Sequence, residues 1–149
     1  MYGQVIFKPI RAELLKDEES FGTQDPFCKI KTQSGEFKTK TCTDGGKKPV
    51  WNDAFTINLA TDSNIHLTIW DDDTISADDF IAETNIDLAG TLAQGVNSKW
   101  FDLYSKGQLF GKILVEIHSQ QGTGNQGYGQ PGYGQQPGYG QQQGYAYPK

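Results

Sequence analysis

The sequence predicts an all-β domain, either a sandwich or a barrel, over residues 1–119, followed by a disordered tail over residues 120–149. Three observations lead to this prediction. Short runs rich in Val, Ile, Phe and Thr alternate with turn-forming residues throughout the first part. No segment there keeps the apolar periodicity of an amphipathic helix. From Gln120 the composition changes abruptly, and no aliphatic residue larger than Ala146 occurs again.

Alternation of apolar and polar residues defines the individual strands. The clearest is 65–70, where Ile, Leu and Ile alternate with His, Thr and Trp, and a hairpin is predicted across Ser34-Gly35. The predicted strands are 4–14, 27–32, 37–41, 55–59, 65–70, 80–88, 99–103 and 112–118. Loops are expected at 15–24, 44–49 and 71–79, and residues 89–97 are expected to form a helical turn or a loop.

The tail repeats Gly-Tyr at Gly127, Gly132, Gly138 and Gly144 on a Gly/Gln/Pro background, and its only charged residue is Lys149. Such a segment cannot bury enough apolar surface to offset its chain entropy, so we expect disorder. Regularly spaced tyrosines can make weak multivalent contacts. A passive tether and a segment that contacts itself or protein partners therefore both remain open.

The overall composition indicates a cytoplasmic protein that is not an enzyme and does not bind nucleic acid. The formal net charge of −5 disfavours phosphate-backbone binding. The start of the chain has no signal-peptide pattern, and no apolar run is long enough to span a bilayer. Cys28 and Cys42 lack metal-ligand spacing and fit reduced thiols. His66 and His118 lie in predicted strands without a nucleophile nearby, and Trp51 and Trp100 are expected to fill the core.

Carboxylates are concentrated in two predicted loops, which points to a metal ion. The first loop contains Asp17, Glu18, Glu19 and Asp25, and the second contains Asp71, Asp72, Asp73, Asp78 and Asp79. Two carboxylates ~5 Å apart repel by roughly 3 kcal/mol at an effective dielectric constant of about 20, so a fold that gathers several of them needs a counter-ion. Calcium prefers many oxygen ligands and tolerates irregular loops, whereas zinc and copper prefer His or Cys. An EF-hand is excluded, because Ala77 stands where its turn glycine belongs.

These residues resemble the C2 domain family in three motifs that occur in the family's order. Residues 22–30 (GTQDPFCKI) are similar to G-x-x-DPY-x-K-[VIL], residues 49–55 (PVWNDAF) to P-x-WNE-x-F, and residues 71–83 to D-x-D-x(5)-DFIG-E. The segments 100–103 and 111–115 extend the resemblance, which covers residues 3–118. It implies an eight-stranded antiparallel Greek-key β-sandwich with the type II strand permutation, in which three loops at one end bind two or three calcium ions.

The resemblance also implies the ligands. Matched position by position, they are Asp25, Asp71, Asp73 and Asp79, with Glu19 at a fifth position where the family usually has Asp. Asp17, Asp72 and Ser76 are candidate auxiliary ligands, Asp72 through its carbonyl oxygen.

Four lysines on a predicted hairpin form a second candidate site. Lys29 and Lys31 are two residues apart on one strand, and Lys38 and Lys40 are two apart on its partner, so both pairs can face the same side. With Phe27 and Trp70 beside them, they resemble the phosphoinositide groove of conventional protein kinase C C2 domains. An ordinary solvated edge that resists strand addition is the alternative.

Two apolar residues lie within the polar loops. Phe21 in the first loop and Ile75 in the third are candidates for insertion into lipid, although either could fold back onto the sandwich.

The sequence therefore predicts a module that binds anionic phospholipid membranes, phosphoinositides being one candidate headgroup, when calcium rises. Two alternatives remain. The first is a calcium-insensitive C2 module that scaffolds proteins through its sheet edge or tail. The second is a protein whose tail dominates, in condensates or with RNA, against which the lack of Arg in the tail weighs.

Overall fold

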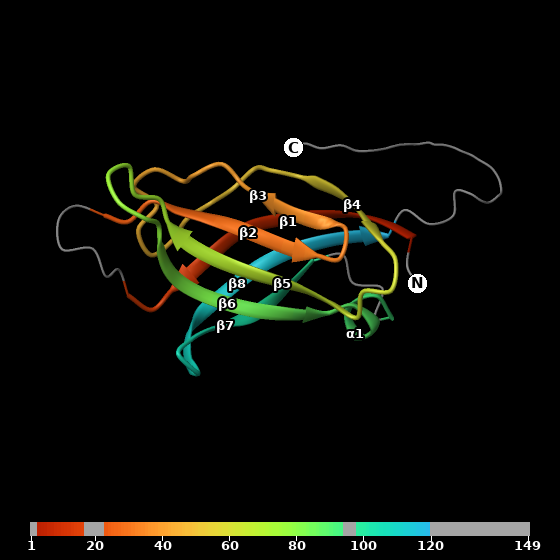
Figure 1. The fold of residues 1–149 in the computed structure, drawn as a ribbon. Helices are drawn as coiled ribbons and strands as arrows, with labels where there is room; N and C mark the ends of the chain where they lie inside the picture. Colours follow the sequence, from red (N-terminus) through yellow and green to blue (C-terminus); the bar gives the residue numbers. More distant parts are fainter. Residues whose placement is uncertain (1–2, 17–22, 94–97, 120–149) are drawn as a thin grey trace.

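The computed structural model describes residues 3–16, 23–93 and 98–119, which form strands and one short helix (Figure 1). The elements are β1 (Gly3–Leu14), β2 (Pro26–Thr32), β3 (Gly35–Lys38), β4 (Phe55–Leu59), β5 (Asn64–Asp71), β6 (Asp79–Asp87), α1 (Leu88–Ala93), β7 (Ser98–Ser105) and β8 (Gln108–Ser119). The predicted all-β architecture with eight strands is confirmed.

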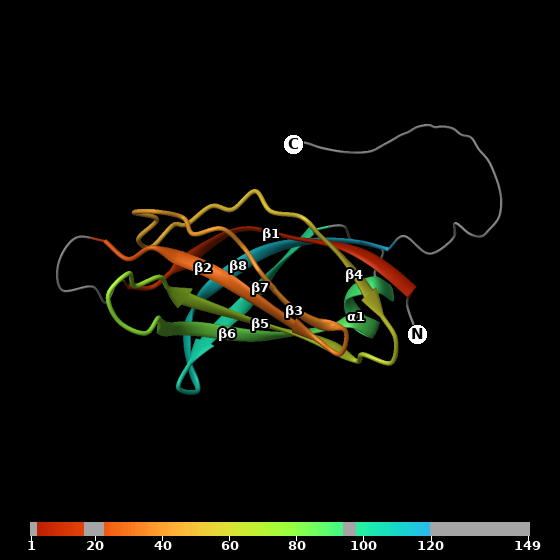
Figure 2. The same cartoon turned by 45° about the horizontal axis from the view of Figure 1, so that its top comes forward.

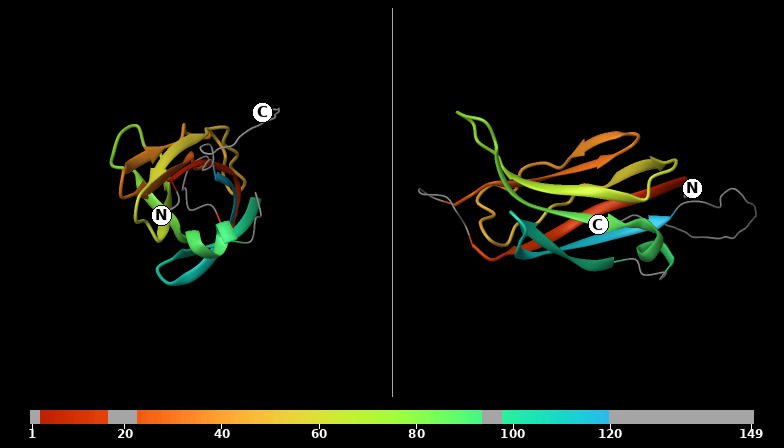
Figure 3. Two further views of the ribbon diagram at one scale, coloured as in Figure 1. Left: turned by 90° about the vertical axis from the view of Figure 1, so that its right-hand side faces the viewer. Right: turned by 60° about the horizontal axis from the view of Figure 1, so that its bottom comes forward.

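The strands form two facing layers. Their hydrogen-bonded order is β3-β2-β5-β6-β7-β8-β1-β4, and every pairing is antiparallel. The first layer is β3-β2-β5-β6 and the second is β7-β8-β1-β4. The pairing that joins the two layers is short, because β6 and β7 pair only at Glu83 and Tyr104. Seen end-on, the strands surround a central space in Figure 3, and the long strands run roughly along one axis of the molecule in Figure 2. The first and last strands, β1 and β8, pair with each other.

The core lies between these layers and follows the alternation seen in the sequence. Ile65, Leu67 and Ile69 of β5 are completely buried, and their polar neighbours point outward. Residues of the other layer, including Phe7 of β1 and Ile113 of β8, belong to the same hydrophobic cluster. Each such side chain contributes about 1.5–3 kcal/mol through burial, so this cluster supplies the main driving force for folding.

The two tryptophans predicted to fill the core behave differently. Trp51 is buried, and its Nε1–H donates to the carbonyl oxygen of Pro26 at 3.1 Å, as expected for a core indole. The prediction for Trp100 is wrong, because its ring is only half-buried. The ring centroid lies 5.4 Å from the guanidinium carbon of Arg11 and 4.8 Å from Nζ of Lys112. Because Arg11 and Lys112 are exposed residues of β1 and β8, the Trp100 ring lies on the outer face of the second layer.

Strand β3 ends before the predicted position, and a side chain explains why. The backbone N–H of Thr39 donates to the carbonyl oxygen of Cys28, but the backbone N–H of Cys28 donates to the hydroxyl Oγ1 of Thr39. The Thr39 side chain thus replaces the backbone carbonyl that would continue the ladder. Lys40 consequently lies beyond the strand, and its backbone N–H donates to the carboxylate of Asp53 at 3.3 Å. The prediction that Lys40 lies on the partner strand with Lys38 is wrong.

Strands β7 and β8 are longer than predicted and form a tight hairpin. Lys106 and Gly107 have φ values of 53° and 77°, and the flanking residues Ser105 and Gln108 pair directly. Two consecutive positive φ angles are typical of a type I′ turn, whose twist matches that of paired strands. In the sequence, the Lys106-Gly107 dipeptide is the feature that indicates this turn.

The remaining predictions on organisation lie partly outside the described residues. Helix α1 has six residues and begins within one residue of the predicted helical turn, but residues 94–97 are outside the described part, as is the predicted tail, 120–149. Within the described ranges, no helix combines the length and apolar composition needed to cross a bilayer. Both Cys28 and Cys42 are free thiols.

Candidate metal centre and cationic face

Strand pairing brings the acidic residues to one end of the molecule. Asp71 is the last residue of β5, and Asp79 is the first residue of β6, and the two are directly paired across the strands. The loop between them, 72–78, returns the chain within a few residues. Because β2 begins beside the end of β5, with Pro26 opposite Asp71, Asp25 lies at the same end.

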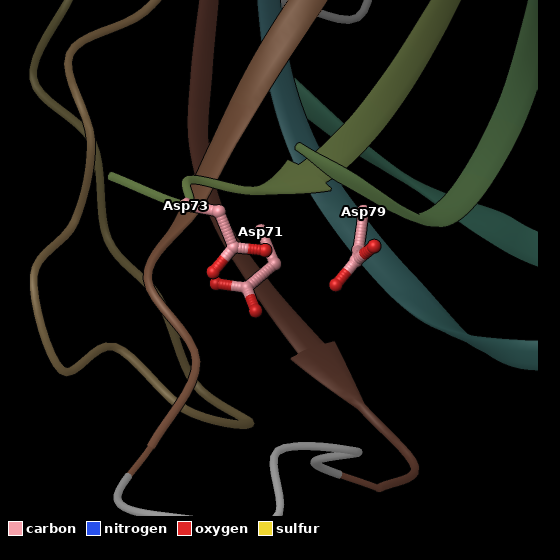
Figure 4. Close-up of side chains that lie close together, drawn as sticks. All are labelled: Asp71, Asp73 and Asp79. Atoms are coloured by element: carbon pink, nitrogen blue, oxygen red, sulfur yellow. The ribbon is translucent and has the colours of Figure 1, made fainter. Parts of the chain in front are cut away.

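Three carboxylates form a cluster there, which we call the carboxylate cluster: Asp71, Asp73 and Asp79. One oxygen of each lies within 4.8 Å of the others, and Figure 4 shows the three side chains extending into the same space. Asp71 is 4% exposed, Asp73 is half-buried and Asp79 is exposed. The cluster is therefore open to solvent on one side and anchored in the fold on the other.

Desolvation and repulsion within the cluster both act on the pKa of one member. Partial desolvation, followed by the negative charges of Asp71 and Asp79, raises the pKa of Asp73 above its ordinary value of 3.8. The nearby Asp78 acts in the same direction. The charged form of the cluster is thus disfavoured by the folded structure, and a cation between the oxygens would relieve this cost.

Asp25 is fixed beside the cluster through its backbone. Its N–H donates to Oδ1 of Asp71 at 2.8 Å, and its carbonyl oxygen accepts from the N–H of Asp72 at 2.9 Å. Its carboxylate does not join the cluster, since Oδ1 accepts from the backbone N–H of Asp44 at 2.7 Å. The structure thus places Asp25 next to the predicted partners while its side chain binds the loop before β4.

Two further aspartates organise the loops. The carboxylate of Asp72 accepts from the hydroxyl of Thr41 at 2.5 Å, and it does not belong to the cluster. Asp78, which the sequence did not single out as a site residue, accepts from the backbone N–H of Asp73 at 3.0 Å and so fixes the loop backbone. The sequence feature that could have indicated this role is the position of Asp78 within the acidic run, five residues after Asp73.

The other predicted loop residues divide into two groups. Ser76 is exposed, and Ile75 is 98% exposed at the tip of the 72–78 loop. Glu19, Asp17 and Phe21 lie outside the described residues, so their proposed roles stay predictions.

The donor set of the cluster fits calcium. Every candidate ligand atom in it is a carboxylate oxygen, and no His or Cys belongs to the group among the described residues. Hard oxygen ligands in a cluster that is open to solvent on one side suit calcium, which accepts irregular geometry and completes its shell with water or other oxygens. Asp71, Asp73 and Asp79 are therefore the residues that could hold the ion.

The predicted lysine site forms a surface that we call the cationic face: Phe27, Lys29, Lys31, Lys38 and Trp70. Since Cys28 and Ile30 point into the core, the residues that alternate with them on β2 point outward. Lys29 pairs with Lys38 on β3, and Phe27 pairs with Trp70 on β5. Four of the six residues predicted to bind a headgroup thus lie on adjacent positions of one sheet face, with Lys31 two positions further along β2.

Aromatic rings hold the lysines of the cationic face in place. Nζ of Lys29 lies 4.5 Å from the ring centroid of Trp70, and Nζ of Lys38 lies 5.2 Å from that of Phe27. Trp70 is itself fixed by a hydrogen bond from Nε1–H to Oγ1 of Thr68 at 2.8 Å and by an edge-on contact with Phe80 at 5.5 Å. Phe27 is only 2% exposed, so it supports the lysines and does not present its ring to solvent.

A histidine and an acidic residue adjoin this face, and the sequence did not predict that they contact each other. Nε2 of His66 lies 2.9 Å from Oε1 of Glu83, and these residues occupy the outward positions of β5 and β6. Lys31 is paired with His66 and with Glu36 across the sheet. The face is therefore cationic on β2 and β3 and becomes neutral or acidic toward β6.

Comparison with known proteins identifies relatives for most of the described part. Residues 3–103 match the C2 domain family. The chain is 31% identical over 84 residues to the 16 kDa phloem protein 2 of Cucurbita maxima, covering 53% of this chain and 61% of that protein. It is 30% identical over 80 residues to Elicitor-responsive protein 1 of Oryza sativa subsp. japonica, covering 50% of each. The matched part thus spans about half to three fifths of these relatives.

Solved structures share the fold. A C2 domain-containing protein from a putative elicitor-responsive gene has a TM-score of 0.70 and 20% identity, with 83% of this chain and 93% of that chain covered. The pair of C2 domains of Extended-Synaptotagmin 2, solved with calcium bound, gives a TM-score of 0.62 and 20% identity, with 78% of this chain and 45% of that chain covered. Identities this low establish the common architecture alone.

Proposed function

The chain belongs to the C2 domain family, and from this premise we propose that it binds anionic phospholipid membranes when the carboxylate cluster holds calcium. The observation that carries the proposal is the convergence of three carboxylate oxygens within 4.8 Å on an exposed end of the sandwich. A C2 domain pair of similar fold that was solved with calcium bound supports it. We expect two or three ions, with Glu19 as the fifth carboxylate ligand and Asp17 as its auxiliary.

The chain's residues would produce an electrostatic switch. Without a cation, Asp71, Asp73 and Asp79 make the loop end negative and repel an anionic surface. Bound calcium would supply positive charge and open coordination positions for lipid phosphate oxygens. The backbone N–H of Asp25 donates to Oδ1 of Asp71 at 2.8 Å, so the first and third loops are already held together at the cluster. Ile75, which is 98% exposed at the loop tip, is positioned to enter the lipid, and Phe21 is its predicted counterpart.

Co-sedimentation with mixed phosphatidylserine–phosphatidylcholine vesicles, with calcium or with chelator, tests the proposal. We expect pelleting only with calcium, and much less in Ile75→Ser, because that substitution removes apolar area that would be buried in lipid. Equal pelleting in both conditions, together with a melting temperature that calcium does not change, would instead favour the calcium-insensitive scaffold.

The cationic face is proposed to hold a phosphorylated headgroup. Lys29, Lys31 and Lys38 share one surface, and each can contribute ~1 kcal/mol near an anionic leaflet. Lys40 lies just beyond the strand and is exposed, so it can add to the same field.

Substitution of the paired lysines tests this second element. The double variant Lys29→Ala/Lys38→Ala should weaken binding to vesicles containing a phosphoinositide by roughly 30-fold, about fivefold for each lysine. Lys112→Ala removes an exposed lysine from the other layer and is the matched control. Equal affinity of wild type and double variant for these vesicles would contradict the headgroup site.

The proposal assigns a binding role without catalysis. Both histidines are paired with carboxylates on strands, His66 with Glu83 and His118 with Glu116, and Cys28 is buried with a raised pKa because of desolvation. A buried thiol of raised pKa is a poor nucleophile. We therefore propose that the protein is not an enzyme.

From the calcium-dependent membrane binding proposed above, we propose in addition that the protein is cytoplasmic and is recruited to membranes when calcium rises.

A further inference from the structure

The β7–β8 hairpin lies at the same end of the molecule as the carboxylate cluster. β6 begins at Asp79 in the cluster and runs away from it, and β7 runs antiparallel to β6. The chain therefore returns to the cluster end at Ser105, turns at Lys106 and Gly107, and continues as β8. Figure 1 shows this hairpin projecting at the same end as the 72–78 loop, and Figure 3 (right) confirms the placement from a second side.

A cleft separates the hairpin from the rest of that end. Its volume is about 610 Å³, within the size range of small-molecule sites. Its walls come from the end of β1, the start of β6 and the hairpin, and they include Leu15, Asp79, Phe80, Lys106, Leu109 and Phe110. Because Asp71 and Asp79 also border it, the cleft opens directly beside the carboxylate cluster.

Exposed apolar side chains are concentrated around this cleft. The described residues contain six exposed large hydrophobic residues, and three of them line the cleft: Leu15 (63%), Phe80 (39%) and Leu109 (54%). Two more lie nearby, Ile75 (98%) on the 72–78 loop and Tyr104 (43%) on the hairpin. Tyr104 and Leu109 are directly paired across the hairpin, so their side chains share one face. An apolar surface concentrated on one end, with charged residues around it, marks a contact with lipid or with another protein.

We propose that the cleft seats a phospholipid of the bilayer, so that the β7–β8 hairpin forms a further membrane-contacting segment beside the carboxylate cluster. The chemistry of the walls fits an amphipathic anion. Lys16 and Lys106 complement a phosphate, and Leu15, Phe80 and Leu109 suit the upper part of an acyl chain. The type I′ turn fixes Lys106 and Gly107, so this segment is already ordered before contact.

A bilayer is favoured over a protein partner by the position of the cleft. It adjoins the cluster and shares its end of the molecule with Ile75, which is almost fully exposed. The inference rests on the proposed function, because it assumes that this end faces a membrane. Its experiments must therefore separate loss of the hairpin contact from loss of membrane binding altogether.

The first experiment places an environment-sensitive fluorophore on the hairpin. Gln108 is exposed and lines the cleft, so Gln108→Cys is labelled in a Cys42→Ser background, which leaves only the buried Cys28. We expect a blue shift with calcium and phosphatidylserine–phosphatidylcholine vesicles, and none with a label at Ala60→Cys, an exposed position after β4 at the opposite end. An unchanged label at 108 on protein that pellets with the vesicles would overturn the inference alone. A shift with calcium but without vesicles would indicate self-association and would also overturn it.

The second experiment changes an apolar wall residue. Leu109→Asp should raise the lipid concentration needed for half-maximal binding by about tenfold or more, because a largely exposed leucine loses its burial in lipid. Val50→Asp is the matched control, since Val50 is 53% exposed but lies outside the cleft. The expected result is a loss in the first variant only, with calcium still raising the melting temperature of both. Wild-type affinity in Leu109→Asp, or equal losses in both variants, would contradict the hairpin contact, whereas failure of the wild type to bind vesicles would contradict the proposed function itself.

Discussion

Asp71 is the residue that links the loop before β2 to the loop after β5. It is almost fully buried, it accepts a backbone hydrogen bond from Asp25, and its carboxylate also borders the cleft. An ionised carboxylate that is largely removed from water gains more from a bound cation than one on an open loop does. Asp72, its neighbour in the sequence, has a different environment, since its carboxylate is bound to Thr41.

Replacing these two aspartates separates their roles. Saturating calcium should stabilise the wild type by about 2.7 kcal/mol at 100 times its Kd, because the ion binds the folded state. Asp71→Asn should lose most of this gain and should melt at a higher temperature than the wild type in chelator, because the repulsion is relieved while the amide still accepts from Asp25. Thermal unfolding with and without calcium measures both effects. Asp72→Asn is the control, and an equal loss in it would argue against the assignment.

Glu116 on β8 provides a second residue-scale prediction, far from the acidic loops. Desolvation opposes its ionisation, but hydrogen bonds and charges from His118 and Lys8 outweigh this, and the pKa of Glu116 is lowered from its ordinary value of 4.5. A lowered pKa in the folded state means that the carboxylate stabilises the protein above pH 4.5 and that this contribution is lost as the pH falls through the lowered value. Glu116→Gln should therefore be less stable than the wild type at neutral pH, with the difference disappearing in acid. A difference that is independent of pH, measured by denaturant unfolding, would show that the ionised group is not responsible.

At the scale of elements, the contact between β1 and β8 depends on Gly111. Its φ is +147°, and a Cβ there would lie 2.2 Å from the carbonyl oxygen of Glu13 and 3.0 Å from Cα of Leu14. Gly111→Ala should therefore cost at least about 2 kcal/mol, because two paired strands would have to separate. Gly107→Ala in the turn is the comparison. It has φ +77° but nothing within 4 Å, so only conformational strain of about 1 kcal/mol is expected. Equal unfolding free energies in the two variants would exclude close packing as the cause.

The strands could be predicted from the sequence wherever burial alone defines them. β4 begins and ends where the alternation places it, at Phe55 and Leu59, because its apolar residues face one core. The ends of β3, β7 and β8 could not be placed this way. β3 ends because the Thr39 hydroxyl replaces a backbone acceptor, and the hairpin extends because Lys106 and Gly107 adopt positive φ. Such local hydrogen bonds and turn conformations leave no trace in a hydrophobic period.

In the candidate site, too, some features could be predicted from the sequence and others could not. The resemblance to C2 domains implied Asp71, Asp73 and Asp79 as ligands, and the three meet because β5 and β6 are consecutive strands joined by a short loop. The direction of the Asp25 carboxylate toward Asp44 depends on the long loop before β4, whose path the motif does not encode. The burial of Phe27 depends likewise on a lysine that crosses over it from another strand.

For the whole molecule, the hydrophobic core that the described residues form runs from Val5 to Ile117. A truncated protein comprising residues 1–119 should therefore keep the melting temperature of the full chain and its response to calcium, because it retains the whole of this described core. Comparison of thermal unfolding and vesicle binding for the two lengths tests this. A clear loss of calcium-dependent recruitment on truncation would instead assign the membrane role to residues 120–149.

The sheet order leaves two open edges, at β3 and β4, and their composition has a consequence for crowding. β3 has four residues, two of them the charged Glu36 and Lys38, and β4 has five. Short edges with charged side chains are poor templates for adding another strand. When many copies gather on a vesicle, neighbouring domains should consequently meet through their side chains and stay separable, without fusing into continuous β-structure.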